Sequence, residues 1–301
     1  MYLSYSGHKT YSVCPKQYWH SYLDKTAPEK PENKVNSLYG SVVGTLFEIF
    51  YADRLWMKKG VEELLLSMAE ETLDRIVVKE TQKGVVEYKD KDKASNYKDR
   101  AALLKDVRES IPRGIGIIRY HRLLGTDAEA EVKLDSWVGG HRIGGRADFI
   151  MTRLRPHGDL VILDGKGSKW REKYVDPWQL KWYAMLYREK HAAVPDALGF
   201  VFWRSDPEEG MDWVPFSRLD LDELKEAVLV SATHIEAGKA KLDEVGKAEQ
   251  AQVLHELFPA KPSRDCKLCA FLATCMEGQA YESAVLPAAI FEADGVEDVG
   301  V

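Results

Sequence analysis

The stretch from Val161 to Ser168 reads VILDGKGS, an apolar run that ends in a carboxylate, a glycine and an ammonium group. An apolar run bounded by turn-forming residues predicts a buried strand. Unpaired charges are costly in such a place, so Asp164 and Lys166 must find partners where the strand ends. The stretch therefore predicts a binding site at one end of a β-sheet.

A second acid lies on the strand expected just before this one. Residues 144–150 read GGRADFI and carry Asp148. If the two strands are neighbours, Asp148 and Asp164 meet at one sheet end, and Lys166 shares a face with Asp164. Two acids beside a lysine suit Mg²⁺ or Mn²⁺, which polarise a phosphodiester and activate water. Lys166 would orient that water or stabilise charge on the phosphate. The alternative is a surface ion pair between Asp164 and Lys166, with Asp148 in a turn.

The rest of the chain alternates between helical and strand patterns. Helices are expected over residues 4–23, 37–78, 97–124 with a break near Pro112 and Gly114, 175–190 and 219–242, and a polar loop over 83–96. Strands are expected over 129–154, with a hairpin at Gly139–Gly140, and over 161–165, 197–204 and 211–216. These patterns predict an α/β fold with a central mixed β-sheet flanked by helices.

Charge is distributed unevenly along the 301 residues. The net charge is −6, and residues 277–301 carry six acids and no Lys or Arg, so −6 minus −6 leaves the first 276 residues neutral. Local basic clusters, such as Lys166, Lys169 and Arg171, decide binding to polyanions more than the net charge does. No apolar run reaches the roughly 18 residues of a membrane span, and the N-terminus lacks a signal-peptide pattern. We expect a cytoplasmic protein with no membrane partner.

Four cysteines complete the list of candidate ligands. Cys266, Cys269 and Cys275 form a C-x₂-C-x₅-C group, and Cys14 lies near the N-terminus. In an intracellular protein a metal site accounts for them better than disulfides do. A zinc ion and a [4Fe-4S] cluster both fit four thiolates.

The order Asp148, Asp164, Lys166, Gln179 and Tyr183 resembles the motifs of the PD-(D/E)XK nuclease superfamily, and specifically of its RecB-like exonuclease branch. In that branch a helix after the catalytic strand carries Gln and Tyr. Gln179 and Tyr183 are four residues apart and therefore share one helical face, from which they can reach a phosphate or brace Lys166. The resemblance implies a restriction-endonuclease-like core.

One position departs from the family pattern. Relatives often carry a histidine ligand in G-T-x-x-H, whereas this chain reads Gly44-Thr45-Leu46-Phe47-Glu48. Glutamate is also a ligand for hard cations. The resemblance then implies that Glu48, Asp148, Asp164 and the carbonyl of Gly165 hold Mg²⁺ or Mn²⁺. The alternative is an exposed helix glutamate.

The cysteines match the same branch. The nuclease AddB and the CRISPR-associated adaptation exonucleases carry one N-terminal cysteine and a later C-x₂-C-x₅-C group, which hold a [4Fe-4S] cluster. The resemblance assigns this cluster to Cys14, Cys266, Cys269 and Cys275. It also implies one nuclease domain over residues 1–276, with a helical part (1–125), the core (126–218) and C-terminal helices with the cysteines (219–276), followed by an acidic tail (277–301).

The resemblance implies a metal-dependent DNA exonuclease that hydrolyses phosphodiester bonds from single-stranded ends, in recombination, repair, or CRISPR-type or phage DNA processing. Trp170, Tyr174 and Trp178 are candidates to stack on unpaired bases. No G-x-x-x-x-G-K-[ST] motif is present, so unwinding would require a helicase or a recombination or adaptation partner. The alternatives are a catalytically silent DNA-binding subunit of a recombination or spacer-acquisition complex, and a zinc-stabilised structural protein.

Overall fold

The structure, a computed structural model of the chain, describes residues 1–25, 34–88, 97–124, 127–168, 171–245 and 247–293. It divides into two compact units. One unit comprises Leu3–Pro31 and Val228–Val301, and the other comprises Glu32–Ala227 together with Tyr2. We call them the terminal unit and the central unit and describe each by itself. Among the described helices, none combines the length and the apolar character that a bilayer span requires.

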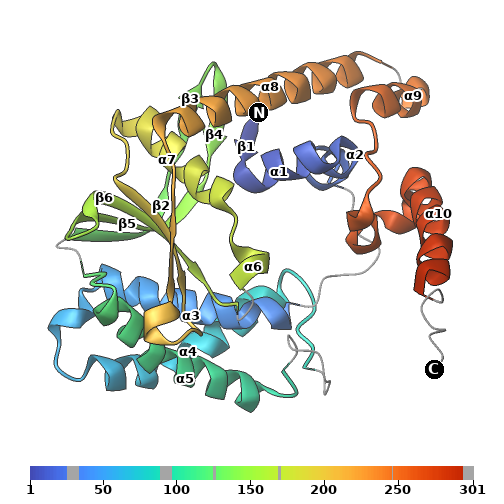
Figure 1. Cartoon of the computed structure of the whole chain (residues 1–301). Helices are drawn as coiled ribbons and strands as arrows, with labels where there is room; N and C mark the ends of the chain where they lie inside the picture. Colours follow the sequence, from blue (N-terminus) through green and yellow to red (C-terminus); the bar gives the residue numbers. More distant parts are fainter. Residues whose placement is uncertain (26–33, 89–96, 125–126, 169–170, 246, 294–301) are drawn as a thin grey trace, which may run out of the picture. The chain divides into compact units, whose positions relative to one another are not determined.

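The central unit is built on a five-stranded mixed sheet with the order β2-β5-β6-β7-β8 (Figure 1). Strands β6 and β7 pair in parallel, and the other neighbours are antiparallel. The α/β fold with a mixed sheet flanked by helices, expected from the sequence, is therefore confirmed. The strands are β2 (Asp127–Lys133), β5 (Arg146–Leu154), β6 (Gly158–Lys166), β7 (Ala197–Phe202) and β8 (Met211–Val214).

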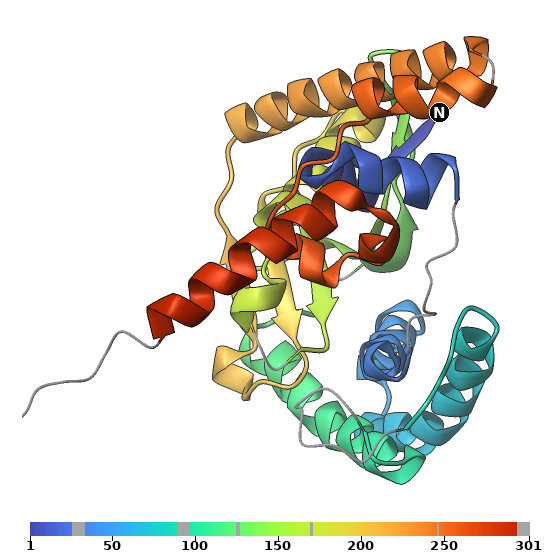
Figure 2. The same cartoon turned by 90° about the vertical axis from the view of Figure 1, so that its right-hand side faces the viewer.

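Both faces of this sheet are buried, which explains the continuous apolar run in β6. Phe149 and Leu163 belong to a core cluster shared with three helices: α3 (Val35–Ala52), α4 (Val61–Thr81) and α5 (Arg100–Tyr120). Ile150 and Ile162 alternate with them and point to the other face, which α7 (Pro177–His191) covers. Figures 1 and 2 show α3, α4 and α5 side by side, and α7 separate from them.

Two helix predictions for the central unit need correction. The helix expected over 37–78 is two helices, because Arg54 and Gly60 have positive φ values of 50° and 68° and the chain turns between α3 and α4. The break expected near Pro112 is absent, since α5 runs through it. Pro112 lies on the exposed side of α5, where water can satisfy the carbonyl that loses its partner. Gly114 is buried, and a Cβ there would lie 2.1 Å from the Phe47 ring.

The hairpin expected at Gly139–Gly140 is confirmed. Strands β3 (Ser136–Val138) and β4 (His141–Gly144) pair across it. Both glycines have positive φ, 55° and 86°, which suits the tight turn of a two-residue hairpin loop. The short helix α6 (Arg171–Tyr174) precedes α7, and α8 (Arg218–Glu244) follows β8.

The terminal unit joins the first helices to the last ones. After the short strand β1 (Tyr2–Ser4) come α1 (Tyr5–Val13), α2 (Pro15–Tyr18) and a π-helical turn (Trp19–Leu23), so the helix expected over 4–23 is interrupted at Cys14, which has an extended backbone. The C-terminal part contributes α9 (Lys247–Leu257), 3-10 turns at Arg264–Leu268 and Leu272–Thr274, and α10 (Met276–Ala293). Phe258 packs against Tyr11 and Trp19, which gives this unit an aromatic core.

Candidate functional site

The ends of β5 and β6 bring Asp148 and Asp164 together, as expected. Phe149 pairs with Leu163, so the two acids occupy the next positions at the same end of the antiparallel pair. The Gly165 backbone N–H donates to Asp148 Oδ2 at 2.8 Å. Asp164 is only 2% exposed, which rules out the alternative of a surface ion pair.

Lys166 lies at the centre of a hydrogen-bonded network on the α7 face of the sheet. Its Nζ is 2.6 Å from Asp164 Oδ1 and donates to Gln179 Oε1 at 2.9 Å. The Gln179 amide donates to Asp164 Oδ2 at 3.0 Å and to the Tyr183 hydroxyl at 3.1 Å. The predicted residues Asp148, Asp164, Lys166, Gln179 and Tyr183 therefore meet at one place.

Helix α7 is held against this strand end by close contacts at two glycines. A Cβ at Gly145 would lie 3.0 Å from the Tyr183 ring, and the Trp182 indole donates to the Gly144 carbonyl at 3.2 Å. Pro177 begins the helix, where its fixed φ and missing N–H cost nothing. The four-residue spacing of Gln179 and Tyr183 then turns both side chains toward β6.

Burial dominates the electrostatics of the two acids. Burial, and next the charge of Asp164, raise the pKa of Asp148 well above its ordinary value. Burial also raises the pKa of Asp164, and the Lys166 ammonium opposes that rise. One lysine thus faces two buried carboxyls, and a bound divalent cation would balance their charge when both are ionised.

In the described part of the chain, no hydrogen bond or ion pair joins Glu48 of α3 to Asp148, Asp164 or Lys166. Glu48 is half-buried, and its carboxyl is close enough to that of Glu131 to share a hydrogen bond. Burial, followed by the charge of Glu131, raises the pKa of Glu48 to about 7. Among the described residues, no three His, Cys, Asp or Glu side chains lie close enough to enclose a metal ion. The donor chemistry nevertheless fits Mg²⁺ or Mn²⁺, since every predicted ligand offers a hard oxygen.

Glu131 of β2 is an acid of this site that the sequence patterns did not predict. Its neighbours in the strand pair with Phe149 and Ala147, so Glu131 lies opposite Asp148. Its φ of 53° falls in the left-handed region that non-glycine residues rarely adopt. Arg146 donates to its carboxylate at 2.8 Å. Glu131 influences the pKa values of both Glu48 and Asp148, and it is therefore the acid that links α3 to the strand ends.

A family model for the PD-(D/E)XK nuclease superfamily matches residues 2–276. The chain belongs to the PD-(D/E)XK nuclease superfamily. Membership in the superfamily indicates nuclease activity on a nucleic acid, and nucleases of this superfamily typically use a divalent metal ion.

Two further comparisons add less. A solved structure described as the crystal structure of SSO0001 is similar over 57% of this chain and 74% of its own, with 18% identity and a TM-score of 0.28. None of the curated proteins compared with the chain matches it.

All four cysteines of the chain line one pocket of the terminal unit. Cys14, Cys266, Cys269 and Cys275 are half-buried free thiols around a cavity of about 40 Å³. Burial raises the pKa of Cys269, and the nearby Cys14 and Cys266 add to that rise. Among the residues that the structure describes, no three His, Cys, Asp or Glu side chains are close enough to bind one metal ion. The four thiols as placed are therefore too far apart to bind a single ion.

Short-range contacts hold the cysteine segments in place. The Ser263 N–H points at Cys266 Sγ, 3.4 Å away, and a Cβ at Gly278 would lie 3.5 Å from Cys275 Sγ. Lys16, two residues after Cys14, pairs with Glu277 at 2.8 Å, and this contact lowers the pKa of Glu277 to about 2. The N-terminal and C-terminal parts of the terminal unit are thus joined beside the cysteines.

The Glu48–Glu131 pair can be tested in the metal-free protein. We expect Glu131→Gln to lower the pKa of Glu48 from about 7 toward its ordinary value of 4.5, because it removes a like charge and frees Arg146. NMR titration of the glutamate side-chain carboxyl resonances measures this shift. Glu129→Gln, an exposed acid of the same strand, serves as the control and should leave that pKa unchanged.

Proposed function

We propose that this protein is a Mg²⁺- or Mn²⁺-dependent deoxyribonuclease of the RecB-like branch, acting as an exonuclease on single-stranded DNA ends. The observation that carries the proposal is the network of Asp164, Lys166 and Gln179 beside Asp148 at the end of β6. In this proposal Glu48, Asp148, Asp164 and the Gly165 carbonyl hold the metal. The nuclease domain would span residues 1–276.

A bound divalent ion would polarise the phosphodiester and lower the pKa of a bound water. Lys166 supplies a positive charge for the phosphate oxygens, where negative charge develops. Gln179 fixes the Lys166 ammonium through its Oε1, and Tyr183 fixes Gln179 in turn. The Lys166 ammonium also lies over the aromatic ring of Phe200 of β7, 5.1 Å from the ring centre.

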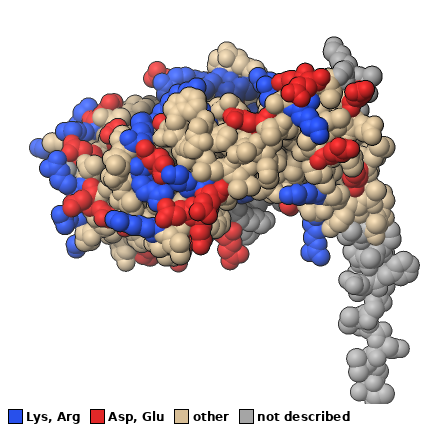
Figure 3. Space-filling model, turned by 90° about the horizontal axis from the view of Figure 1, so that it is seen from above, with Lys and Arg blue, Asp and Glu red and all other residues tan. Residues whose placement is uncertain are grey.

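Contact with DNA would depend on the charged and aromatic side chains near this network. On the face of the molecule in Figure 3, acidic and basic side chains are mixed. Trp178 of α7 is 46% exposed, and the Lys181 ammonium lies 4.7 Å from its ring centre. It is therefore an available stacking surface for an unpaired base. Trp170 lies outside the described residues, as does the side chain of Tyr174.

We also propose that the four cysteines hold a [4Fe-4S] cluster. Their shared pocket supports this, because a cavity of about 40 Å³ is larger than the roughly 10–15 Å³ that a single water needs. A lone zinc ion, with bonds of about 2.3 Å to four sulfurs, would need those sulfurs closer to one point than a four-iron cluster does. A helicase or a recombination or adaptation protein would supply the single strands.

A cleavage assay with Mn²⁺ and end-labelled single strands tests the proposed activity. We expect Lys166→Ala to reduce cleavage by roughly 10²-fold or more, as loss of one charge-stabilising donor does in other enzymes. Lys83→Ala, which removes an exposed lysine that pairs with the neighbouring Glu80, should cleave like the unaltered protein. Wild-type protein that binds DNA without cutting it would instead favour the silent-subunit alternative.

Blocking the DNA ends tests the exonuclease mode. We expect circular single strands, and linear ones with both termini blocked, to resist digestion, while linear strands with one free end are shortened stepwise. Digestion of the circles at a rate similar to that of the linear strands would contradict the exonuclease mode but not the nuclease activity.

A further inference from the structure

Trp203, the first residue after β7, lies directly beneath the catalytic end of β6. Its indole is 1% exposed, and a Cβ added at Gly165 would lie 2.7 Å from its Nε1. Its backbone N–H donates to the Lys166 carbonyl at 3.1 Å. Because Gly165 alternates with Asp164 and Lys166, the indole supports the strand from the face opposite the Gln179 network.

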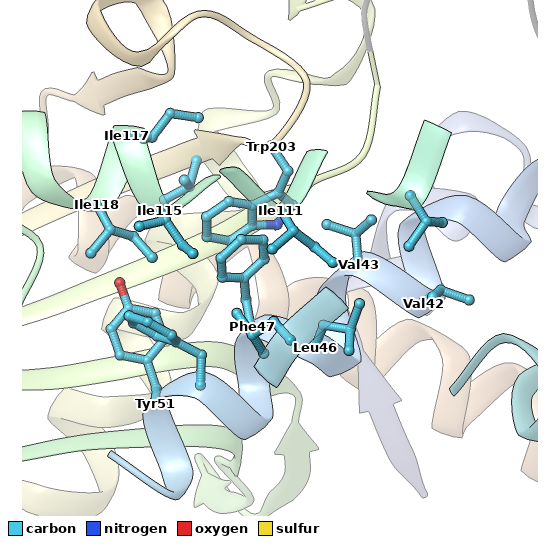
Figure 4. Close-up of a cluster of buried hydrophobic side chains, with 14 of the residues drawn as sticks. Val42, Val43, Leu46, Phe47, Tyr51, Ile111, Ile115, Ile117, Ile118 and Trp203 are labelled. Carbon is cyan, nitrogen blue, oxygen red and sulfur yellow. The ribbon is translucent and has the colours of Figure 1, made fainter. Parts of the chain in front are cut away.

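The same indole contacts the helix that carries Glu48. It stacks on the ring of Phe47, with centroids 4.1 Å apart and planes 11° apart (Figure 4). Phe47 immediately precedes Glu48 in α3. The Phe47 ring cannot move back toward α5, because it already fills the space where a Cβ at Gly114 would be. The stack therefore fixes the separation between α3 and the end of β6.

A second contact fixes α3 at its other end. A Cβ at Gly167 would lie 2.8 Å from the Gly40 Cα, so the backbones touch there. Arg204 places its guanidinium 3.4 Å from the centre of the Tyr39 ring and pairs with Asp106 of α5 at 2.6 Å. Consecutive residues after β7 thus hold α3 at two places, and Trp203 is the one next to Glu48.

We infer that Trp203 is a positioning residue that sets the distance between Glu48 and the Asp164–Lys166 end of β6, so that both layers can reach one metal ion. The inference rests on the proposed metal site. The acids come from opposite sides of the sheet, and only the packing between these layers can bring them to a common ion. A shorter side chain at residue 203 leaves α3 free to shift, and such loosening of a support commonly costs about 10- to 100-fold in metal affinity.

Mn²⁺ affinity, measured by titration calorimetry at pH 8 without DNA, tests this inference. We expect Trp203→Leu to raise the Kd for Mn²⁺ at least about tenfold, and Trp203→Phe, which keeps an aromatic ring on Phe47, to raise it less than about threefold. Leu73→Ala shortens a buried side chain of the same cluster on α4, a helix that carries no proposed ligand, and should leave the Kd within about twofold. If Trp203→Leu does not fold, Phe47→Leu breaks the same stack from the α3 side and carries the same expectation.

Repeating the Mn²⁺ titration in a Glu48→Ala protein distinguishes a positioning role of Trp203 from a general loosening of the fold. In a Glu48→Ala protein, Trp203→Leu should change the Kd by less than about twofold, because the ligand that it positions is gone. The inference is overturned if the tenfold loss persists in that background, if Leu73→Ala causes an equal loss, or if the protein binds no Mn²⁺. If the Kd values for Mn²⁺ change as expected but the protein does not cut DNA, the proposed function is contradicted and this inference is not.

Discussion

Asp148→Asn should abolish metal-dependent cleavage without destabilising the metal-free protein. Asparagine keeps the shape of the side chain, and its oxygen can still accept from the Gly165 N–H. It removes a negative ligand, so we expect cleavage to fall by at least roughly 10³-fold. The measurement is the cleavage rate of end-labelled single strands with saturating Mn²⁺.

The stability part of this expectation follows from the pKa of Asp148. Burial and Asp164 raise that pKa above the ordinary value of 3.8, so the carboxyl contributes stability below about pH 4 that is lost as pH rises through its folded pKa. At pH 8 the charged form therefore costs stability, and Asp148→Asn should unfold at a temperature roughly 2–4 °C higher for each kcal/mol that it relieves. The difference should shrink as the pH approaches 4.

Exposed Asp159, which pairs with Arg155 on the surface, provides the control. Asp159→Asn should cleave normally and unfold at an unchanged temperature. An Asp148→Asn protein that cleaves within tenfold of the wild-type rate would show that the buried acid does not hold the metal. A folded, inactive variant with a lower unfolding temperature would contradict the electrostatic explanation.

Cys275→Ser should remove the cofactor and destabilise the terminal unit. A [4Fe-4S] cluster would close a loop of about 250 residues between Cys14 and the C-terminal group. By analogy with a disulfide, closing such a loop contributes on the order of 5 kcal/mol, which is an upper value because Lys16 and Glu277 still join the two segments. We expect the purified variant to lose absorbance near 400 nm and its iron, and to unfold at lower denaturant concentration.

Met276→Ser is the matched control, because Met276 adjoins Cys275 and is 79% exposed. It should keep the colour, the iron content and the stability of the unaltered protein. Colourless protein that carries one zinc per chain after anaerobic purification would overturn the cluster proposal, because zinc is d¹⁰ and has no visible absorption. It would leave the nuclease site unaffected, since that site lies in the central unit.

Much of the site could be predicted because short-range geometry decides it. Alternation along a strand places Asp164 and Lys166 on one face, and a spacing of four places Gln179 and Tyr183 on one face of a helix. Given that β5 and β6 are neighbours, the meeting of Asp148 with Asp164 follows. These inferences need only local periodicity and one strand pairing.

The features that were missed depend on backbone angles and layer packing, which no periodicity encodes. The left-handed backbone of Glu131 turns an acid of an ordinary alternating strand toward Glu48. The positive φ at Arg54, in the turn that follows α3, is likewise unusual for a residue other than glycine. Pro112 stays within α5 because the apolar face of that helix outweighs one lost hydrogen bond. The sequence does not distinguish Trp203 from an ordinary core residue, because its role depends on its position beneath Gly165.

Anomalous diffraction from crystals soaked in Mn²⁺ tests the account most directly. We expect one strong peak at the end of β6, about 2.1 Å from carboxylate oxygens of both Asp148 and Asp164, with the Lys166 ammonium nearby. Crystals that take up Mn²⁺ only elsewhere, or none at all, would contradict a metal-dependent nuclease at this site.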